Sequence, residues 1–269
     1  MQCGYRPSYL NFSVNGGERR LLRDPRPSIL YLIMKKYLIW VASLALLQGL
    51  DTSSLLHAEP LETNEVSMAS APAWLKVNQV QKVVDRIQNS MEWDIRKVKV
   101  YWYADPALFL KAHGFDGTVL AFSRKSDNSI HLGPRVDLRS FDGLFGHELV
   151  HVIVYQKYKD AIPKWLEEGL ANYIGRKSPV DYAWLGKQTP IAEVRNLVHP
   201  YQKSKVPAAY HYAASTALAE MIASHCDLED LLKLSVGKNL ENYLSTYCGI
   251  EDVNKSFREW VTKKSTRAN

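Results

Sequence analysis

Apolar residues follow two different spacings in the first part of this chain. Between residues 74 and 91 they recur every three or four positions, which is typical of an amphipathic helix: Val77, Val80, Val84, Ile87 and Met91. Residues 98–103 are instead β-branched and aromatic, and they predict a strand. Two further apolar runs, 118–122 and 129–132, lie on either side of the polar segment 125–128 and predict a β-hairpin.

Helical patterns predominate after residue 106. We expect helices over 107–113, 142–158, 163–174, 208–224, 227–235, 240–247 and 251–263. The two at 142–158 and 163–174 are apolar around much of their circumference, which indicates burial. Residues 59–71, which begin Glu-Pro-Leu-Glu-Thr-Asn and end Ala-Ser-Ala, are interpreted as a linker. The expected fold is α+β, with a sheet region over 72–206 and a helical C-terminal lobe over 207–269.

The N-terminal region has the features of an export signal. Within residues 34–58, two lysines precede an apolar run at 37–50, and a polar stretch then ends in Ala58. The run is shorter than the about 20 residues that a membrane span needs, so we expect a cleaved signal peptide and a secreted or periplasmic protein. An uncleaved anchor at 37–50 is the alternative. Residues 1–33 are interpreted as an upstream mis-start or an extended n-region.

Charge and composition narrow the function classes. With 46% hydrophobic and 23% charged residues, the chain has the composition of a globular protein. Residues 1–58 hold 7 of the 34 Lys and Arg residues and 3 of the 28 acidic residues, so 59–269 carries only about +2. We therefore expect no nucleic-acid partner. Outside the leader, Cys226 and Cys248 could form a disulfide in an oxidising compartment or remain buried thiols.

The residues from His147 to His151 match an HExxH pattern inside the predicted helix 142–158. Residues four apart share one face of a helix, so both imidazoles can reach a single metal ion while Glu148 projects beside them. The alternative is that both histidines are core residues satisfied by hydrogen bonds. Two imidazoles and a carboxylate in an otherwise apolar helix are costly to bury without a strong shared partner, which favours the metal site.

A catalytic zinc site needs a third protein ligand and an open position for water. Glu168 is the candidate, because a turn at 159–162 and five residues of return at about 1.5 Å each bring it level with His151. Glu167 is the competitor, and it lies about 100° round the helix. The adjacent Gly169 indicates that backbones approach closely on the Glu168 side.

These paired motifs, FGHELVHVIV and WLEEGLANY, resemble those of the gluzincin metallopeptidases, especially the peptidase MA-like group. The motifs cover residues 141–174, and a weaker likeness extends from residue 98 to the C-terminus. The resemblance implies a zincin-like fold and one Zn²⁺ per chain, bound by His147, His151 and Glu168. It also implies that Glu148 is the general base and that an edge strand, 129–132 or its hairpin partner, holds an extended peptide or protein substrate.

Other candidate residues have less specific roles. The resemblance also implies that a Tyr or His of the helical lobe donates a hydrogen bond to the oxyanion, and the candidates are Tyr210, His211 and Tyr212. The Tyr-x-x-Ser pattern ending at Ser215 favours Tyr212. Asn172, one turn beyond Glu168, either orients a histidine ligand or lies on the surface. His131 is expected in the substrate groove or on the surface rather than at the metal.

The resulting prediction is an exported zinc-dependent hydrolase, an endopeptidase-like metallopeptidase. Two alternatives remain open: a non-catalytic envelope protein that binds a peptide or partner, and a zinc amidase that acts on a non-peptide substrate. Membrane contact is expected only if the signal segment is uncleaved.

Overall fold

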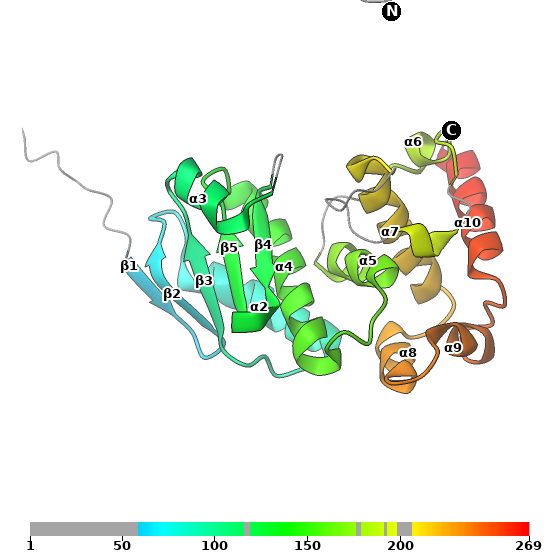
Figure 1. The fold of residues 1–269 in the computed structure, drawn as a ribbon, viewed down its shortest axis with the longest axis horizontal. Coiled ribbons are helices and arrows are strands. Elements are labelled where there is room, and N and C mark those ends of the chain that lie inside the picture. Colours follow the sequence, from blue (N-terminus) through cyan, green and yellow to red (C-terminus); the bar gives the residue numbers. More distant parts are fainter. Residues whose placement is uncertain (1–58, 116–118, 176–178, 191–192, 198–205, 269) are drawn as a thin grey trace, which may run out of the picture. The chain divides into compact units, whose positions relative to one another are not determined.

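The structure, a computed structural model, describes residues 59–115, 119–175, 179–190, 193–197 and 206–268. The described residues form one sheet of five strands. Figure 1 shows this sheet with helices both between and after its strands. The strands are β1 (Glu59–Glu62), β2 (Val66–Ala71), β3 (Val98–Trp102), β4 (Ala121–Arg124) and β5 (Ser129–Leu132). Their order is β1-β2-β3-β5-β4, with β3 parallel to β2 and β5, and with antiparallel pairs at both edges. The fold is therefore α+β with a small mixed sheet.

The prediction of a linker at 59–71 was wrong, because these residues form the antiparallel pair β1 and β2. Leu61 lies opposite Met68, and both side chains are buried in the core. The Thr63 hydroxyl accepts hydrogen bonds from the backbone N–H groups of Glu65 and Val66 and so closes the turn. The strands are short and include small residues, which hides their alternation in the sequence.

The hairpin at 121–132 identifies the edge of the sheet. β5 pairs with β3 on one side and β4 on the other, and all four of its residues are buried. Among the described strands, β4 and β1 are the two edges, so it is the hairpin partner of 129–132 that lies at an edge. The predicted segment 118–122 lies partly outside the described residues.

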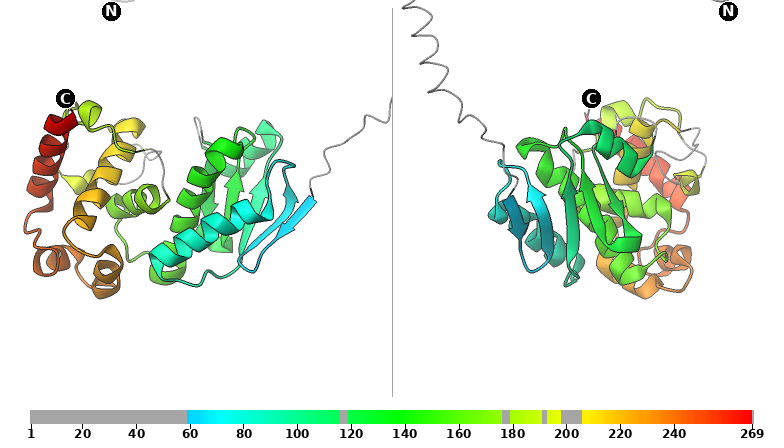
Figure 2. Two further views of the ribbon diagram at one scale, coloured as in Figure 1. Left: turned by 180° about the vertical axis from the view of Figure 1, so that it is seen from behind. Right: turned by 60° about the vertical axis from the view of Figure 1, so that its left-hand side comes forward.

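Helices α2 (Val77–Met91) and α4 (Leu138–Tyr158) cover one face of the sheet, as Figure 2 shows from behind. α4 begins four residues before the predicted start, because the Asp137 side chain accepts a hydrogen bond from the backbone of Ser140 and caps the helix. α3 (Pro106–His113) ends at Gly114, whose φ of 66° favours glycine. Thus the HExxH residues lie in the middle of a long, well-capped helix.

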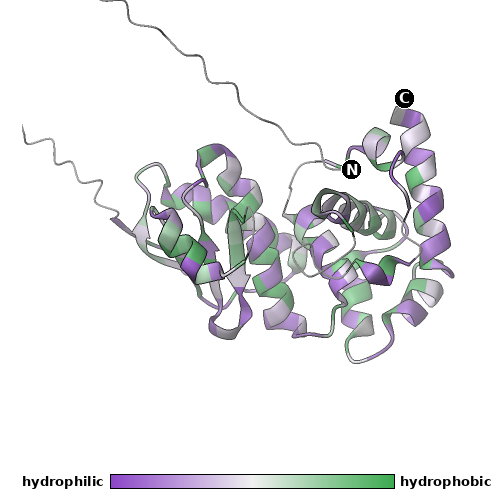
Figure 3. Ribbon diagram, turned by 45° about the horizontal axis from the view of Figure 1, so that its top comes forward, coloured by the Kyte–Doolittle hydropathy of each residue, from purple (hydrophilic) through white to green (hydrophobic). Residues whose placement is uncertain are grey.

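The C-terminal part is mainly helical, and α5 connects it to the sheet region by packing against both α4 and α7. Its helices are α5 (Lys164–Ile174), α6 (Tyr182–Leu185), α7 (Ala208–Ala223), α8 (Leu228–Ser235), α9 (Leu240–Thr246) and α10 (Val253–Ala268). The sequence did not predict α6, which Asp181 caps. Figure 3 shows α10, which leads to the C-terminus, as mostly hydrophilic, whereas α7 is buried along much of its length.

Cys226 and Cys248 form a disulfide, with their Cα atoms 4.9 Å apart. The bond joins the end of the α7 region to the turn after α9. Of the two states that the sequence left open, the structure contains the disulfide.

In the part of the chain that the structure describes, no helix combines the length and apolar character that crossing a bilayer requires. The predicted upstream region 1–33 and signal segment 34–58, with its apolar run 37–50, lie outside the described residues.

Gly169 permits the close approach of α5, but its partner is α7 rather than α4. A Cβ atom at this position would lie 2.3 Å from the backbone oxygen of Ser215 and 3.1 Å from the Ala219 Cβ. The glycine therefore sets the spacing between α5 and α7, and through it the position of the whole helix that carries Glu168.

We predict that Gly169→Ala lowers the free energy of unfolding by about 1–3 kcal/mol, because overpacking outweighs the about 1 kcal/mol gain in helix propensity. Urea denaturation followed by circular dichroism measures this change. Tyr173→Ala, on the exposed side of the same helix, is the control and should change stability less. A higher unfolding midpoint for Gly169→Ala would mean that α5 and α7 can separate without cost.

Candidate metal centre

Helix α4 carries His147, Glu148 and His151 in its interior, and all three residues are buried. The separation of four residues places both imidazoles on one side of the helix, with their Nε2 atoms 3.2 Å apart. The prediction that the two rings can reach a common point is therefore confirmed.

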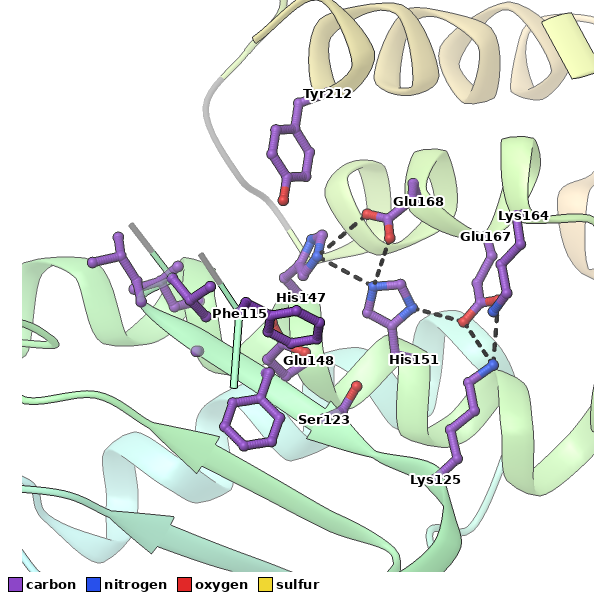
Figure 4. A pocket seen from close by; sticks show the side chains of 15 residues that line it. Phe115, Ser123, Lys125, His147, Glu148, His151, Lys164, Glu167, Glu168 and Tyr212 are labelled. Carbon is purple, nitrogen blue, oxygen red and sulfur yellow. Dashed lines mark hydrogen bonds and ion pairs between the residues drawn. The ribbon is translucent and has the colours of Figure 1, made fainter. Parts of the chain in front are cut away.

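Helix α5 returns past α4 and brings Glu168 to the same point. One carboxylate oxygen lies 3.7 Å from the Nε2 atom of His147, and the other lies 3.7 Å from that of His151. Figure 4 shows the carboxylate facing both rings from the neighbouring helix. The turn length in the sequence correctly predicted that Glu168 would return to the level of the histidines.

His147, His151 and Glu168 form a buried group that could bind a metal ion, since their ligand atoms lie within 4.8 Å of one another. Tetrahedral zinc with ligand bonds of about 2.1 Å places its ligand atoms roughly 3.4 Å apart. The separations of 3.2 and 3.7 Å fall on both sides of that value. Two imidazoles and one carboxylate are also a common donor set of catalytic zinc sites, so the residues fit this metal.

Glu167 has a role that the sequence did not reveal. Its Oε1 atom lies 2.9 Å from the Nδ1 atom of His151, on the side of the ring opposite the metal group. A carboxylate at this position holds the ring orientation and directs Nε2 toward a metal ion. The two neighbouring glutamates therefore contact the two different nitrogens of His151. In the sequence, the only sign of these two separate contacts is the presence of two adjacent glutamates.

Asn172 does not orient a histidine in this structure, and it is buried rather than on the surface. Neither polar atom of its side chain has a hydrogen-bond partner among the described residues. The histidine contact that was one of the two alternatives for Asn172 is made by Glu167, the residue before Glu168.

The electrostatics of the group favour a positive charge. Burial lowers the pKa of His151, but the carboxylates of Glu168 and Glu167 outweigh this effect and raise it to about 9. Burial would raise the pKa of Glu167, yet the hydrogen bond and charge of His151, with Lys164, hold it well below its usual range. The carboxylates that favour a proton here would also favour a metal cation.

A cavity of about 350 Å³ opens onto this group, and its wall includes Glu148 beside the two histidines. The edge strand β4 forms another part of the wall through Ala121, Phe122 and Ser123. Glu148 thus lies where it can reach a molecule bound in the cavity.

Tyr212 is the one of the three candidate donors that lines this cavity. Its ring lies 6.4 Å from that of His147, centroid to centroid, and Figure 4 shows its hydroxyl directed toward the metal group. Tyr210 and His211 are buried in α7, and the His211 ring lies within 3.4 Å of the Ser215 hydroxyl.

His131 is not one of the three residues that could bind the metal, as expected. The prediction that it lies in the substrate groove or on the surface was wrong. Its ring is buried and stacks between Tyr101 and Phe122, with centroid distances of 4.9 and 4.4 Å. Its two nitrogens lie 2.8 and 2.9 Å from the hydroxyls of Tyr103 and Ser129. Burial and the charge of Arg124 lower its pKa to about 4. Tyr101 and Phe122 lie directly opposite His131 on the two neighbouring strands, and their rings account for its burial.

Comparison with models of known protein families and with curated protein sequences finds no match to this chain.

Proposed function

We propose that this protein is a zinc-dependent metallopeptidase with endopeptidase-like activity. The observation that carries the proposal is the convergence of His147, His151 and Glu168 beside Glu148 in one cavity. A binding module has no evident need for a carboxylate next to the metal ligands. The HExxH and WLEEGLANY motifs, which resemble those of gluzincins, and the α+β fold support a zincin-like assignment.

Bound zinc would lower the pKa of a coordinated water to about 7 and polarise the carbonyl of the scissile bond. Glu148 then has two tasks: it accepts the proton of the attacking water, and it later donates that proton to the leaving amine. Glu148 is buried in the cavity wall that also contains His147 and His151. Glu167 fixes the His151 ring throughout.

Substrate binding is assigned to the edge strand β4, because its free side can pair with an extended peptide. Ala121, Phe122 and Ser123 of this strand line the same cavity as the metal group. A peptide paired with β4 would therefore pass in front of Glu148.

Export to an oxidising compartment is part of the proposal. The disulfide between Cys226 and Cys248 supports it, because such bonds persist outside reducing cytoplasm. The N-terminal signal pattern over 34–58 is the second support.

Metal analysis of the purified protein tests the proposed function directly. We expect one zinc per chain, loss of peptide cleavage after chelation, and recovery of cleavage when zinc is returned. An unbiased peptide library supplies the substrates. A protein that folds fully, binds no metal and shows no response to zinc would exclude the proposal. Zinc binding without cleavage of any peptide would favour the binding protein or the amidase instead.

Tyr212→Phe is expected to lower kcat by about 10²-fold, because the hydroxyl would donate a hydrogen bond to the carbonyl oxygen as negative charge develops there. The zinc content should remain unchanged. Tyr210→Phe is the matched control on the same helix and should retain activity, since Tyr210 does not line the cavity. Equal activities of the two variants would remove Tyr212 from this role.

A further inference from the structure

Two lysines meet at the end of the cavity beyond His151. Lys125 follows the edge strand β4, and Lys164 is the first residue of α5. Both side chains line the same cavity as the metal group and face Glu167 in Figure 4. The Lys125 Nζ atom lies 3.2 Å from Glu167 Oε1, and Lys164 forms an ion pair with the other oxygen of the same carboxylate.

Lys125 and Lys164 pair with one buried carboxylate, that of Glu167, and with one exposed carboxylate, that of Asp160. Glu167 is one carboxylate between two ammonium groups, and it also accepts the hydrogen bond from His151. Asp160 lies 3.6 Å from Lys125, but its side chain is 79% exposed, so solvent weakens this pair.

The lysines also keep hydrogen-bonding capacity for a ligand. Each ammonium group has three donors. Lys164 has Glu167 as its ion-pair partner, and 44% of its side chain is exposed at the cavity wall. Strong charge-assisted hydrogen bonds to an incoming carboxylate are therefore available at this position.

The other part of the cavity differs in chemistry. Its wall includes the apolar side chains of Phe115, Val119, Leu120 and Leu144. The cavity thus has an apolar part and a basic part, with the metal group also in its wall. A peptide with an anionic group on one side of its scissile bond matches this distribution.

We propose that Lys125 and Lys164 form an anion-binding subsite that selects peptides with a carboxylate at the His151 end of the cavity. This inference rests on the proposed peptidase function and specifies its substrate class. The carboxylate is either an acidic side chain or the C-terminus of the peptide, since both present the same chemistry to the two ammonium groups.

Binding to the zinc-loaded Glu148→Gln protein separates this inference from catalysis. Fluorescence anisotropy would compare peptides that differ only by Glu or Gln at each position, and each peptide would be made with a free or amidated C-terminus. We expect about tenfold tighter binding of a carboxylate form at one position, with the preference weakened by salt. Preference for Glu identifies a side-chain carboxylate, and preference for the free C-terminus identifies the terminal one.

The double variant Lys125→Met, Lys164→Met should reduce the preference to less than about twofold. Lys159→Met is the matched control and should keep it, because Lys159 does not line the cavity. Zinc content is measured for each variant, and the single variant Lys164→Gln tests the subsite if the double variant does not fold. Equal affinities for carboxylate and amide peptides, no peptide binding, or a preference that survives in the lysine variants would overturn the subsite. Cleavage is then assayed with the unmodified protein. Cleavage of both peptide forms without preference would overturn the subsite alone, whereas failure to cleave any peptide would contradict the proposed function.

Discussion

Glu148→Gln should lower kcat/KM for peptide cleavage by about 10³-fold while leaving one zinc bound per chain. Gln keeps the size of the side chain but cannot accept the proton of the attacking water. The zinc content should not change, because Glu148 is not one of the three residues whose ligand atoms converge. The measurement combines steady-state kinetics on a cleaved library peptide with metal analysis of the same sample.

Glu241→Gln is the control for this prediction. Glu241 lies in the first turn of α9 and is partly exposed, so its replacement should change neither activity nor zinc content. Persistent cleavage by Glu148→Gln would assign the proton transfer to another group. Loss of zinc from this variant would mean that Glu148 supports the metal site as well as the reaction.

The sequence predicted the convergence of His147, His151 and Glu168 well, because helix geometry determines most of it. The four-residue spacing of His147 and His151 requires a shared helix face. The short turn between the two helices makes them antiparallel, and the number of residues from that turn to Glu168 brings Glu168 level with His151. These features depend on backbone geometry, which is regular within helices. The α+β layout was predictable for a similar reason, since long periodic segments identify most of its helices.

Features that depend on side-chain partners were not predictable. The contact of Glu167 with the Nδ1 atom of His151 was missed, because it depends on how α5 packs against α4. His131 was misjudged because its neighbours Tyr101 and Phe122 come from two other strands. The pairing of β1 with β2 was missed since short strands with small side chains lack a clear alternation.

Glu168→Ala is expected to weaken zinc binding more than any other single carboxylate change in this site. Removing one of three protein ligands should lower zinc affinity by well over 10²-fold, whereas a group that only orients a ligand contributes about 10–100-fold. The neighbouring Glu167→Ala is therefore the matched control, on the same helix and equally buried. Competition with a chromophoric zinc chelator measures both affinities without reference to activity.

The two glutamates should also differ in the geometry of the bound metal. Cobalt substituted for zinc reports its ligands through visible absorption, and Glu168→Ala should change this spectrum because one oxygen ligand is replaced. Glu167→Ala should leave the ligand set and hence the spectrum nearly unchanged, although affinity falls as the His151 ring loses its hydrogen bond. If Glu167→Ala instead bound zinc more weakly than Glu168→Ala and showed the altered cobalt spectrum, Glu167 would be the ligand. The arrangement of α5 against α4 would then have to change when metal binds, because Glu167 faces the far nitrogen of the ring.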